Sequence, residues 1–138
     1  MLNLSATAVV KEVLRTAGTI ALVGFSPKKN RPSHLVGCYL IQAGFRVIPV
    51  NPSHSEICGL TCYPDLISIP EPVDIVDIFR RSAEVLPVVE EAIVIGARVI
   101  WMQQGIINRE AAELAENAGL IVIMDRCIKV DHMQSVSA

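Results

Sequence analysis

The chain has 138 residues, of which 51% are hydrophobic and 19% charged, and its net charge is -2. This balance excludes an intrinsically disordered chain, and without a basic excess we expect no nucleic-acid partner. The longest run free of Asp, Glu, Lys and Arg covers residues 32–45, shorter than the roughly 18 residues that a membrane span requires. We therefore expect one globular domain over residues 1–138 and no membrane association.

The cysteines and the opening residues favour a cytoplasmic location. Four cysteines follow no disulfide-framework spacing, and residues 1–13 lack a basic region ahead of an apolar segment, so no secretory signal is predicted. The mean hydropathy of +0.46 is high for a water-soluble monomer. Either both faces of a sheet are covered, or some surface is buried against a partner such as a second copy in a homodimer.

In chain order, a helix over about residues 6–16 precedes five apolar, β-branched runs that predict buried strands. Three amphipathic segments lie between the first and second, the third and fourth, and the fourth and fifth runs. They predict helices that start after Ser33, Ser82 and Asn108 as N-caps and stop at glycines. Residues 51–72 hold four of the eight prolines and predict a loop with a short extended piece near 60–63 and one helical turn. The five predicted strands cover residues 19–23, 46–50, 73–78, 98–102 and 120–124.

The strand spacing predicts the fold class. The strand starts are 22–27 residues apart, which leaves room for a helix in each gap, as in repeated βαβ units. We expect an α/β, Rossmann-like, doubly wound sheet of five parallel strands in the order 3-2-1-4-5, with helices on both faces. Ligands of such sheets bind outside the carboxyl ends of the strands, so the loops after the strands are the candidate site.

The loop after the first strand, residues 24–32, has the composition of a phosphate-binding loop. Gly24 would let backbone N–H groups approach an anion, and a helix starts directly after the loop. Lys28, Lys29 and Arg31 add positive charge. The G-x-G-x-x-G spacing is missing, and Asn51 stands where NAD enzymes place an acid, so NAD binding is disfavoured. NADP or the 3′-phospho-ADP portion of coenzyme A would suit the basic loops better.

No catalytic set is predicted. The three histidines do not pair with a serine or cysteine nucleophile in a known spacing. His54, Cys58 and Cys62 are spaced four apart and offer a weak metal-ligand pattern, but the two cysteines are more typical of small core residues. Cys127 follows the last strand beside Arg126, which would favour its thiolate form, although an inert buried thiol is the more typical state of such a residue.

The loop sequences together resemble the small stand-alone CoA-binding proteins, which are similar in turn to the CoA-binding domain of the succinyl-CoA synthetase alpha subunit. The resemblance covers about residues 19–127, and the order of its motifs is more specific than any one of them. The motifs are V-G-F-S-P-K-K-N-R-P-S at 23–33, V-I-P-V-N-P at 47–52, C-Y-P-D-L at 62–66, V-D-I-F-R at 76–80, W-M-Q-Q-G at 101–105, N-R-E-A-A at 108–112 and M-D-R-C at 124–127.

The resemblance implies coenzyme A as the cofactor, held across the strand ends. The phosphates would lie at the loop after the first strand, the adenosine beside the turn at 50–52 and under residues 79–80, and the pantetheine arm along residues 103–105 toward Cys127. The site residues expected from this resemblance and from the basic loops are Gly24, Phe25, Ser26, Lys28, Lys29, Arg31, Ser33, Val50, Asn51, Pro52, Phe79, Arg80, Gln103, Gly105 and Cys127.

Two departures from the family shape the functional hypothesis. The large acyl-CoA synthetases carry a phosphorylatable histidine and a nucleotide-grasping domain that this sequence lacks, so we expect CoA or acyl-CoA binding without catalysis, in a carrier, sensor or regulatory role. Phe25 stands where a small residue is common, and its ring is expected to crowd the phosphate loop. The alternatives are an NADP- or acyl-CoA-dependent enzyme, and a subunit that completes a CoA ligase with a separate, acyl-CoA-metabolising chain.

Overall fold

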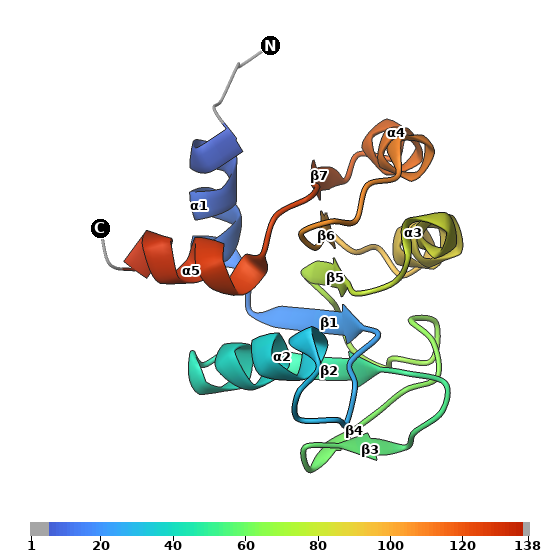
Figure 1. The fold of residues 1–138 in the computed structure, drawn as a ribbon. Helices are drawn as coiled ribbons and strands as arrows, with labels where there is room; N and C mark the ends of the chain where they lie inside the picture. The colour runs from blue at the N-terminus through green and yellow to red at the C-terminus, as the bar shows by residue number, and fades with distance from the viewer. Residues whose placement is uncertain (1–5, 137–138) are drawn as a thin grey trace.

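A computed structural model describes residues 6–136 and contains a five-stranded sheet in which every neighbouring pair is parallel (Figure 1). The strands run in the spatial order β2-β1-β5-β6-β7. The predicted α/β, Rossmann-like fold is confirmed. The strands are β1 (Thr19–Val23), β2 (Arg46–Val50), β5 (Ile75–Ile78), β6 (Val99–Met102) and β7 (Ile121–Ile123).

The predicted strand order, 3-2-1-4-5, is wrong, because β2 is an edge strand of the sheet and the third long strand, β5, lies on the other side of β1. Pro49 in β2 explains the edge position, since proline has no N–H to donate to an inner ladder. Its carbonyl accepts a hydrogen bond from the N–H of Tyr63 at 3.0 Å, and the N–H of Asn51 donates to the Tyr63 carbonyl at 2.9 Å. The outer side of β2 is therefore taken by the segment around Tyr63.

Helices cover both faces of the sheet, as predicted (Figure 1). One face carries α1 (Ala6–Thr16), α2 (Pro32–Gln42) and α5 (Ile128–Val136), and the other carries α3 (Val85–Val94) and α4 (Arg109–Asn117). We refer to these as the α1–α2–α5 face and the α3–α4 face. Because both faces are covered, most of the apolar excess is buried within the chain. Helix α5 was not predicted, since its sequence has no clear apolar stripe.

The helix starts agree only in part with the predicted caps. The Asn108 side chain accepts a hydrogen bond from the N–H of Ala111 at 2.9 Å and caps α4 as predicted. Ser33 is not the N-cap of α2, because the helix already begins at Pro32 with Arg31 as its cap. Ser82 does not cap α3 either, since it opens the 3-10 turn Ser82–Glu84 that precedes this helix.

The Pro-rich stretch after β2 forms a small antiparallel hairpin of β3 (Glu56–Ile57) and β4 (Leu60–Thr61), which packs beside β2. The extended piece predicted near 60–63 is present, whereas the predicted helical turn is absent, because residues 51–72 contain no helix. Within residues 6–136, none of the helices combines the length and apolar character needed to cross a bilayer.

Candidate functional site

The loop after β1 lies directly against the end of β5. Gly24 has a φ of +91°, and a Cβ at this position would lie 2.4 Å from the carbonyl oxygen of Phe79. Only glycine tolerates both the left-handed backbone and this close approach. The N–H of Phe79 donates to the carbonyl of Val23 at 2.8 Å and the N–H of Gly24 to that of Val50 at 2.9 Å. The ends of β1, β2 and β5 are thereby held together as one edge.

The loop after β1 and the start of α2 enclose a cavity of about 330 Å³. Within it, the hydroxyl of Ser33 accepts a hydrogen bond from the N–H of Ser26 at 3.0 Å, and that of Ser26 accepts one from the N–H of Lys28 at 3.1 Å. These bonds fix the curvature of the loop around the helix N-terminus, where the helix dipole favours an anion. The lining residues are Gly24, Ser26, Lys28, Arg31, Pro32, Ser33 and Phe79.

A second cavity of about 370 Å³ adjoins the first, with Pro32 and Phe79 in both linings. It is mostly apolar, and Cys127 lies in its lining. The side-chain oxygen Oε1 of Gln103 accepts a hydrogen bond from the N–H of Ile128 at 3.1 Å, so this side-chain amide also anchors the start of α5. We call the two cavities together the trough. The remaining lining residues of the second cavity are Val36, Gln103, Gln104 and Ile106.

A third, smaller cavity of about 150 Å³ lies at the ends of β1 and β2 on the α3–α4 side. It brings together three of the predicted site residues, Val50, Pro52 and Arg80. Two carboxylates, Asp65 and Glu91, share this lining. The geometry groups the turn after β2 with Arg80, in agreement with their predicted proximity, and separates both from the first cavity.

Phe25 does not crowd the phosphate loop, contrary to the expectation from the sequence. Its side chain is fully buried, and it packs against the backbone of α2 at Gly37, where a Cβ would lie 2.3 Å from the ring. The ring therefore points into the core of the α1–α2–α5 face. What Phe25 offers at the site is its backbone, whose carbonyl accepts a hydrogen bond from the Asn51 side-chain amide at 3.0 Å.

Three further predicted site residues have other structural roles or positions. The Asn51 amide links the turn after β2 to the loop after β1, since its oxygen also accepts from the N–H of Ser53 at 2.9 Å. The N–H of Gly105 donates to the carboxylate of Asp125 at 2.7 Å. Lys29 is exposed on the loop after β1, and its positive charge acts on Cys58 by lowering the pKa of that thiol against larger opposing effects.

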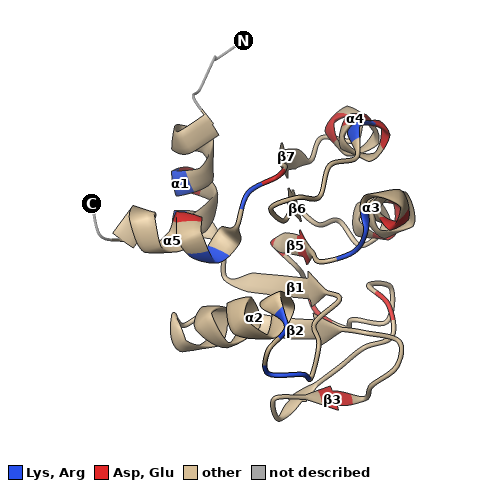
Figure 2. Cartoon of the chain, in the orientation of Figure 1, with Lys and Arg blue, Asp and Glu red and all other residues tan. Residues whose placement is uncertain are grey.

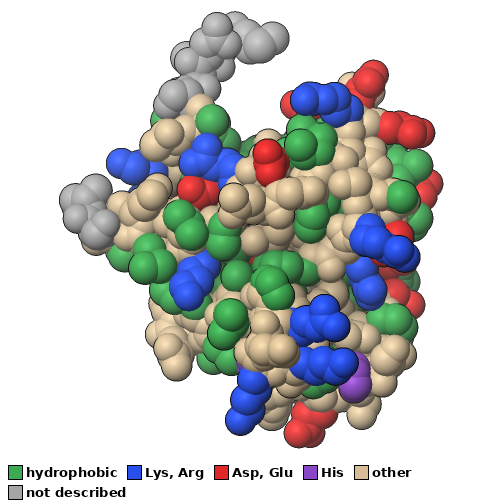
Figure 3. Space-filling model, viewed as in Figure 1, with side chains coloured by type: hydrophobic (Ala, Val, Ile, Leu, Met, Phe, Trp, Pro, Cys, Tyr) green, Lys and Arg blue, Asp and Glu red, His purple; other side chains and the backbone are tan. Residues whose placement is uncertain are grey.

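Basic stretches follow β1, β5 and β7 (Figure 2), and Lys and Arg side chains appear at several places on the face of the molecule drawn in Figure 3. Some of these bases are already paired: Arg126 with Asp131 at 2.8 Å, and Arg81 with Glu84 at 3.1 Å. The hydrogen bond to Asp131 raises the pKa of Arg126. Because this guanidinium is paired, it is a weaker support for a Cys127 thiolate than the sequence indicated. Lys28 and Arg31, by contrast, form no ion pair within residues 6–136.

The metal pattern read from the spacing is not assembled. Cys62 is buried, with its sulfur 3.6 Å from the carbonyl oxygen of Asn51, and burial raises the pKa of this thiol. His54 is exposed in the turn after β2. Within residues 6–136, the group of metal-ligating side chains that does meet consists of His34, Cys38 and Cys58.

Sequence reasoning missed Pro32, Val36, Gln104 and Ile106 in the trough lining. Pro32 and Val36 are one turn apart on α2, and this spacing could have placed them on one face with the predicted loop. Ile106 carried no such signal, because its position depends on how the loop after β6 turns.

A family model described as "CoA binding domain" matches residues 18–133. The chain is 43% identical over 125 residues to the uncharacterized protein YneT of Bacillus subtilis (strain 168), covering 91% of this chain and 93% of that one. A crystal structure described as a hypothetical protein from Pyrococcus horikoshii OT3 superposes with a TM-score of 0.93 at 39% identity, covering 97% of this chain and 94% of that one.

The chain is also 30% identical over 119 residues to acetate–CoA ligase [ADP-forming] I of Archaeoglobus fulgidus, covering 79% of this chain but 17% of the ligase. The match therefore corresponds to one domain of a much longer protein. It agrees with the resemblance to the CoA-binding domain of the synthetases that the loop motifs indicate. On the family match, the fold and the arrangement of the strand ends, the chain belongs to the family of CoA-binding domains.

Proposed function

We propose that this chain, taken as one domain over residues 1–138, binds coenzyme A or an acyl-CoA in the trough at the strand ends without catalysing a reaction. The observation that carries the proposal is that a basic cavity at Gly24 and a mostly apolar cavity lie side by side and share the lining residues Pro32 and Phe79. This sequence of environments matches a ligand with a highly charged phosphate portion and a long, nearly uncharged arm.

The first cavity suits the phosphates. Lys28 and Arg31 lie in its lining without carboxylate partners among residues 6–136, so their charge is available to an anion. The N-terminus of α2 adds a partial positive charge at the same place, worth about 0.3–1 kcal/mol for an exposed anion. Arginine and lysine near a helix N-terminus are a common arrangement for holding phosphate groups.

The second and third cavities suit the two ends of the ligand. Val36, Phe79 and Ile106 give the second cavity apolar walls, and the Gln103 and Gln104 amides supply polar groups for the amides of a pantetheine arm. The half-buried thiol of Cys127 lies at that cavity. Val50, Pro52 and Arg80 line the third cavity, where an adenosine could lie against the turn after β2.

Thermal unfolding with bound nucleotides tests the proposal. A ligand that binds only the folded state raises the Tm, and at equal concentration a tighter ligand raises it more, because the stabilisation grows with the logarithm of ligand concentration over Kd. We expect coenzyme A to raise the Tm clearly more than dephospho-CoA, because the basic loops should contact the 3′-phosphate as well. Replacing Lys28 or Arg31 by Gln should weaken CoA binding about tenfold each, the effect of losing about 1.4 kcal/mol. Lys11→Gln, an exposed base on α1, is the matched control.

Equal stabilisation by coenzyme A and dephospho-CoA would remove the role assigned to the basic loops. A similar loss of affinity in the Lys11→Gln control would show that only overall charge matters. NADPH in the same assay tests the NADP-linked alternative, which requires tight binding and hydride transfer to a carbonyl compound.

The domain-sized match to a CoA ligase supports a second candidate, a subunit that completes such a ligase with a separate chain. Co-purification of an ATP-grasping or ligase-related protein with the tagged chain would favour this role. The four cysteines are all free thiols, which suits the reducing cytoplasm that we propose as the location. A homodimer stays a prediction, to be tested by light scattering.

A further inference from the structure

A second group of chemically active side chains lies outside the lining of the trough. His34 and Cys38 are four residues apart on α2 and so share one side of that helix. Cys58 comes from the turn between β3 and β4. One ligand atom from each of the three residues lies within 4.8 Å of the other two, and the Cys58 sulfur is 3.8 Å from His34 Nε2. The sequence separates these residues by up to 24 positions, and only the hairpin brings them together.

The hydrogen bonding of His34 leaves one ring nitrogen available. Nδ1 lies 2.9 Å from the carbonyl oxygen of Ser26. A carbonyl oxygen can only accept, so Nδ1 carries the proton and Nε2 presents a lone pair. The ring is only 9% exposed and meets the Phe25 ring edge-on, with centroids 5.8 Å apart. A histidine oriented through an N–H to a backbone carbonyl is the arrangement that metal-binding histidines generally show.

Cys58 has an unusual backbone conformation. Cys58 and Gly59 form the two-residue turn of the hairpin, with φ values of +55° and +74°. Such turns normally carry Asn-Gly or Asp-Gly, because a residue other than glycine, asparagine or aspartate is disfavoured at positive φ. Strained positions of this kind concentrate at functional sites. Here the strained residue places its sulfur beside His34.

The two thiols lie close enough for one cation to serve both. One ligand atom from each of His34, Cys38 and Cys58 lies within 4.8 Å of the others. A bound divalent cation would stabilise both thiolates.

We propose that His34 Nε2, Cys38 Sγ and Cys58 Sγ bind a zinc ion, with a water molecule in the fourth position. Zn²⁺ prefers a tetrahedral set of sulfur and nitrogen ligands. Bond lengths of about 2.3 Å to sulfur and 2.0 Å to nitrogen place a sulfur and a nitrogen ligand roughly 3.5 Å apart at the tetrahedral angle. The observed 3.8 Å between Cys58 Sγ and His34 Nε2 is close to that value. On binding, the two thiol protons pass to solvent and the Nδ1 proton stays on His34.

Titration of the fully reduced protein with Co²⁺, followed by displacement with Zn²⁺, tests the site. Cobalt in a tetrahedral thiolate site gives intense thiolate-to-metal charge-transfer absorption that Zn²⁺ abolishes. We expect one equivalent of Co²⁺ to bind with this signature. Cys38→Ser and Cys58→Ser should each weaken binding by more than the roughly 10–100-fold that loss of an outer hydrogen-bond partner costs.

The matched controls are variants of His54 and Cys62, the two residues that are spaced four apart from Cys58 in the sequence but do not join it in the structure. Cys62→Ala and His54→Asn change the residues that the sequence paired with Cys58, and both should leave Co²⁺ binding unchanged. Circular dichroism of each variant checks that it is folded. Three results would overturn the proposal: Co²⁺ binding without the charge-transfer signature, binding that survives Cys58→Ser, or binding lost in the controls. A Cys38–Cys58 disulfide in a protein that binds no metal when reduced would overturn it as well.

Discussion

The two faces of the sheet differ in the kinds of side chain that are buried on them. The α3–α4 face is packed by aliphatic side chains such as Val76, Ile100 and Val89. The α1–α2–α5 face, including its edge at the trough, holds the buried polar and charged side chains found within residues 6–136. These buried polar residues are Ser33, His34, Asp77, Gln103 and Asp131.

This difference in buried side chains suggests different roles for the two faces: one mainly contributes apolar burial, and the other also positions polar groups near the proposed sites. The α3–α4 face contributes mainly apolar burial, worth about 25 cal/mol per Å². On the α1–α2–α5 face, four of the five buried polar side chains make hydrogen bonds. These bonds position the loop at the trough, the start of α5 or the His34 ring beside Cys58. The trough and the group of His34, Cys38 and Cys58 lie on this face or at its edge, whereas the third cavity lies on the α3–α4 side. A polar-to-apolar change at Asp77 and an apolar-to-polar change at Val76, one on each face, should therefore shift the free energy of unfolding in opposite directions.

The largest expected effect comes from the contact between α2 and Phe25. In Gly37→Val, the new Cβ would lie 2.3 Å from the buried Phe25 ring, so the ring or the helix must move. Overpacking of this kind should lower the free energy of unfolding by about 3 kcal/mol, measured by urea denaturation. The same change in a Phe25→Leu background should cost less, because the ring is gone. Equal costs in both backgrounds would contradict the packing argument.

A somewhat smaller effect, of opposite sign, is expected at Asp77. This carboxyl is fully buried on β5 between Leu22 and Trp101 in the neighbouring strands, and neither of its oxygens has a hydrogen-bond partner. Asp74, three residues earlier, does accept backbone N–H groups, from Gly18 at 2.7 Å and from Thr19 at 2.9 Å. Asp77→Val should raise the free energy of unfolding at pH 7 by about 1–3 kcal/mol.

The pH dependence follows from the buried state of Asp77. Burial raises the pKa of Asp77 well above its ordinary value of 3.8. The folded protein therefore holds this proton to higher pH than the unfolded chain, so wild-type stability falls as the pH rises above about 3.8 toward the raised value. The gain from Asp77→Val should be larger at pH 7 than at pH 4. A gain independent of pH would contradict the proposed cause.

Val76→Thr is the matched control for Asp77→Val on the other face. Val76 is the preceding residue of β5 and is fully buried among the aliphatic side chains of the α3–α4 face. The added hydroxyl has nearly the same volume as the methyl group that it replaces, but it is polar and buried. This variant should therefore lower the free energy of unfolding by about 1–3 kcal/mol. A neutral effect would show that the two faces do not differ as described.

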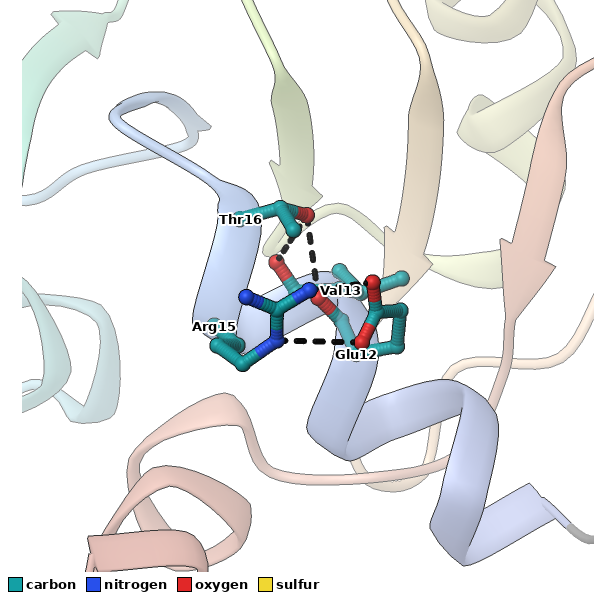
Figure 4. Close-up of polar contacts among 4 residues, drawn as sticks. All are labelled: Glu12, Val13, Arg15 and Thr16. Carbon is teal, nitrogen blue, oxygen red and sulfur yellow. Dashed lines mark hydrogen bonds and ion pairs between the residues drawn. The ribbon is translucent and has the colours of Figure 1, made fainter.

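The smallest effect is expected on the outer side of α1. Glu12 and Arg15 form an ion pair of 2.7 Å one turn apart, and the Thr16 hydroxyl donates to the Glu12 carbonyl at 2.9 Å (Figure 4). The hydrogen bond from Arg15 lowers the pKa of Glu12, yet the two side chains are 69% and 62% exposed. Exposed pairs are screened by water and salt. Glu12→Gln should leave the Tm within experimental scatter, and a clear drop would show that this pair matters more than its exposure implies.

Much of the fold could be predicted because its signals are local. The apolar runs at β1 and β2 and the Asn108 cap depend on neighbouring residues, and all three were found at their observed positions. The strand order was predicted wrongly although Pro49 indicated the edge position of β2, since proline is typical of edge strands. Helix α5 was not predicted, because it is held by contacts with α1 and α2 and has no apolar stripe of its own.

In the candidate site, too, the features that depend on one short segment were predictable and those that depend on distant segments were not. Gly24, Lys28 and Arg31 follow one strand in sequence, so their grouping at one cavity was predictable from a single loop. The direction of the Phe25 ring was not, because it depends on the absence of a side chain at Gly37.

The sequence by itself determined the fold class, the family and the basic loop after β1, because periodicity, turn residues and charge are properties of short segments. Only the tertiary structure decided the order of strands, the joining of two cavities into the trough and the meeting of His34 with Cys58. These depend on segments far apart in the chain, whose relative positions are set by packing and by hydrogen bonds such as those between β2 and Tyr63. Patterns within a short segment of sequence cannot predict contacts between segments that are far apart in the chain.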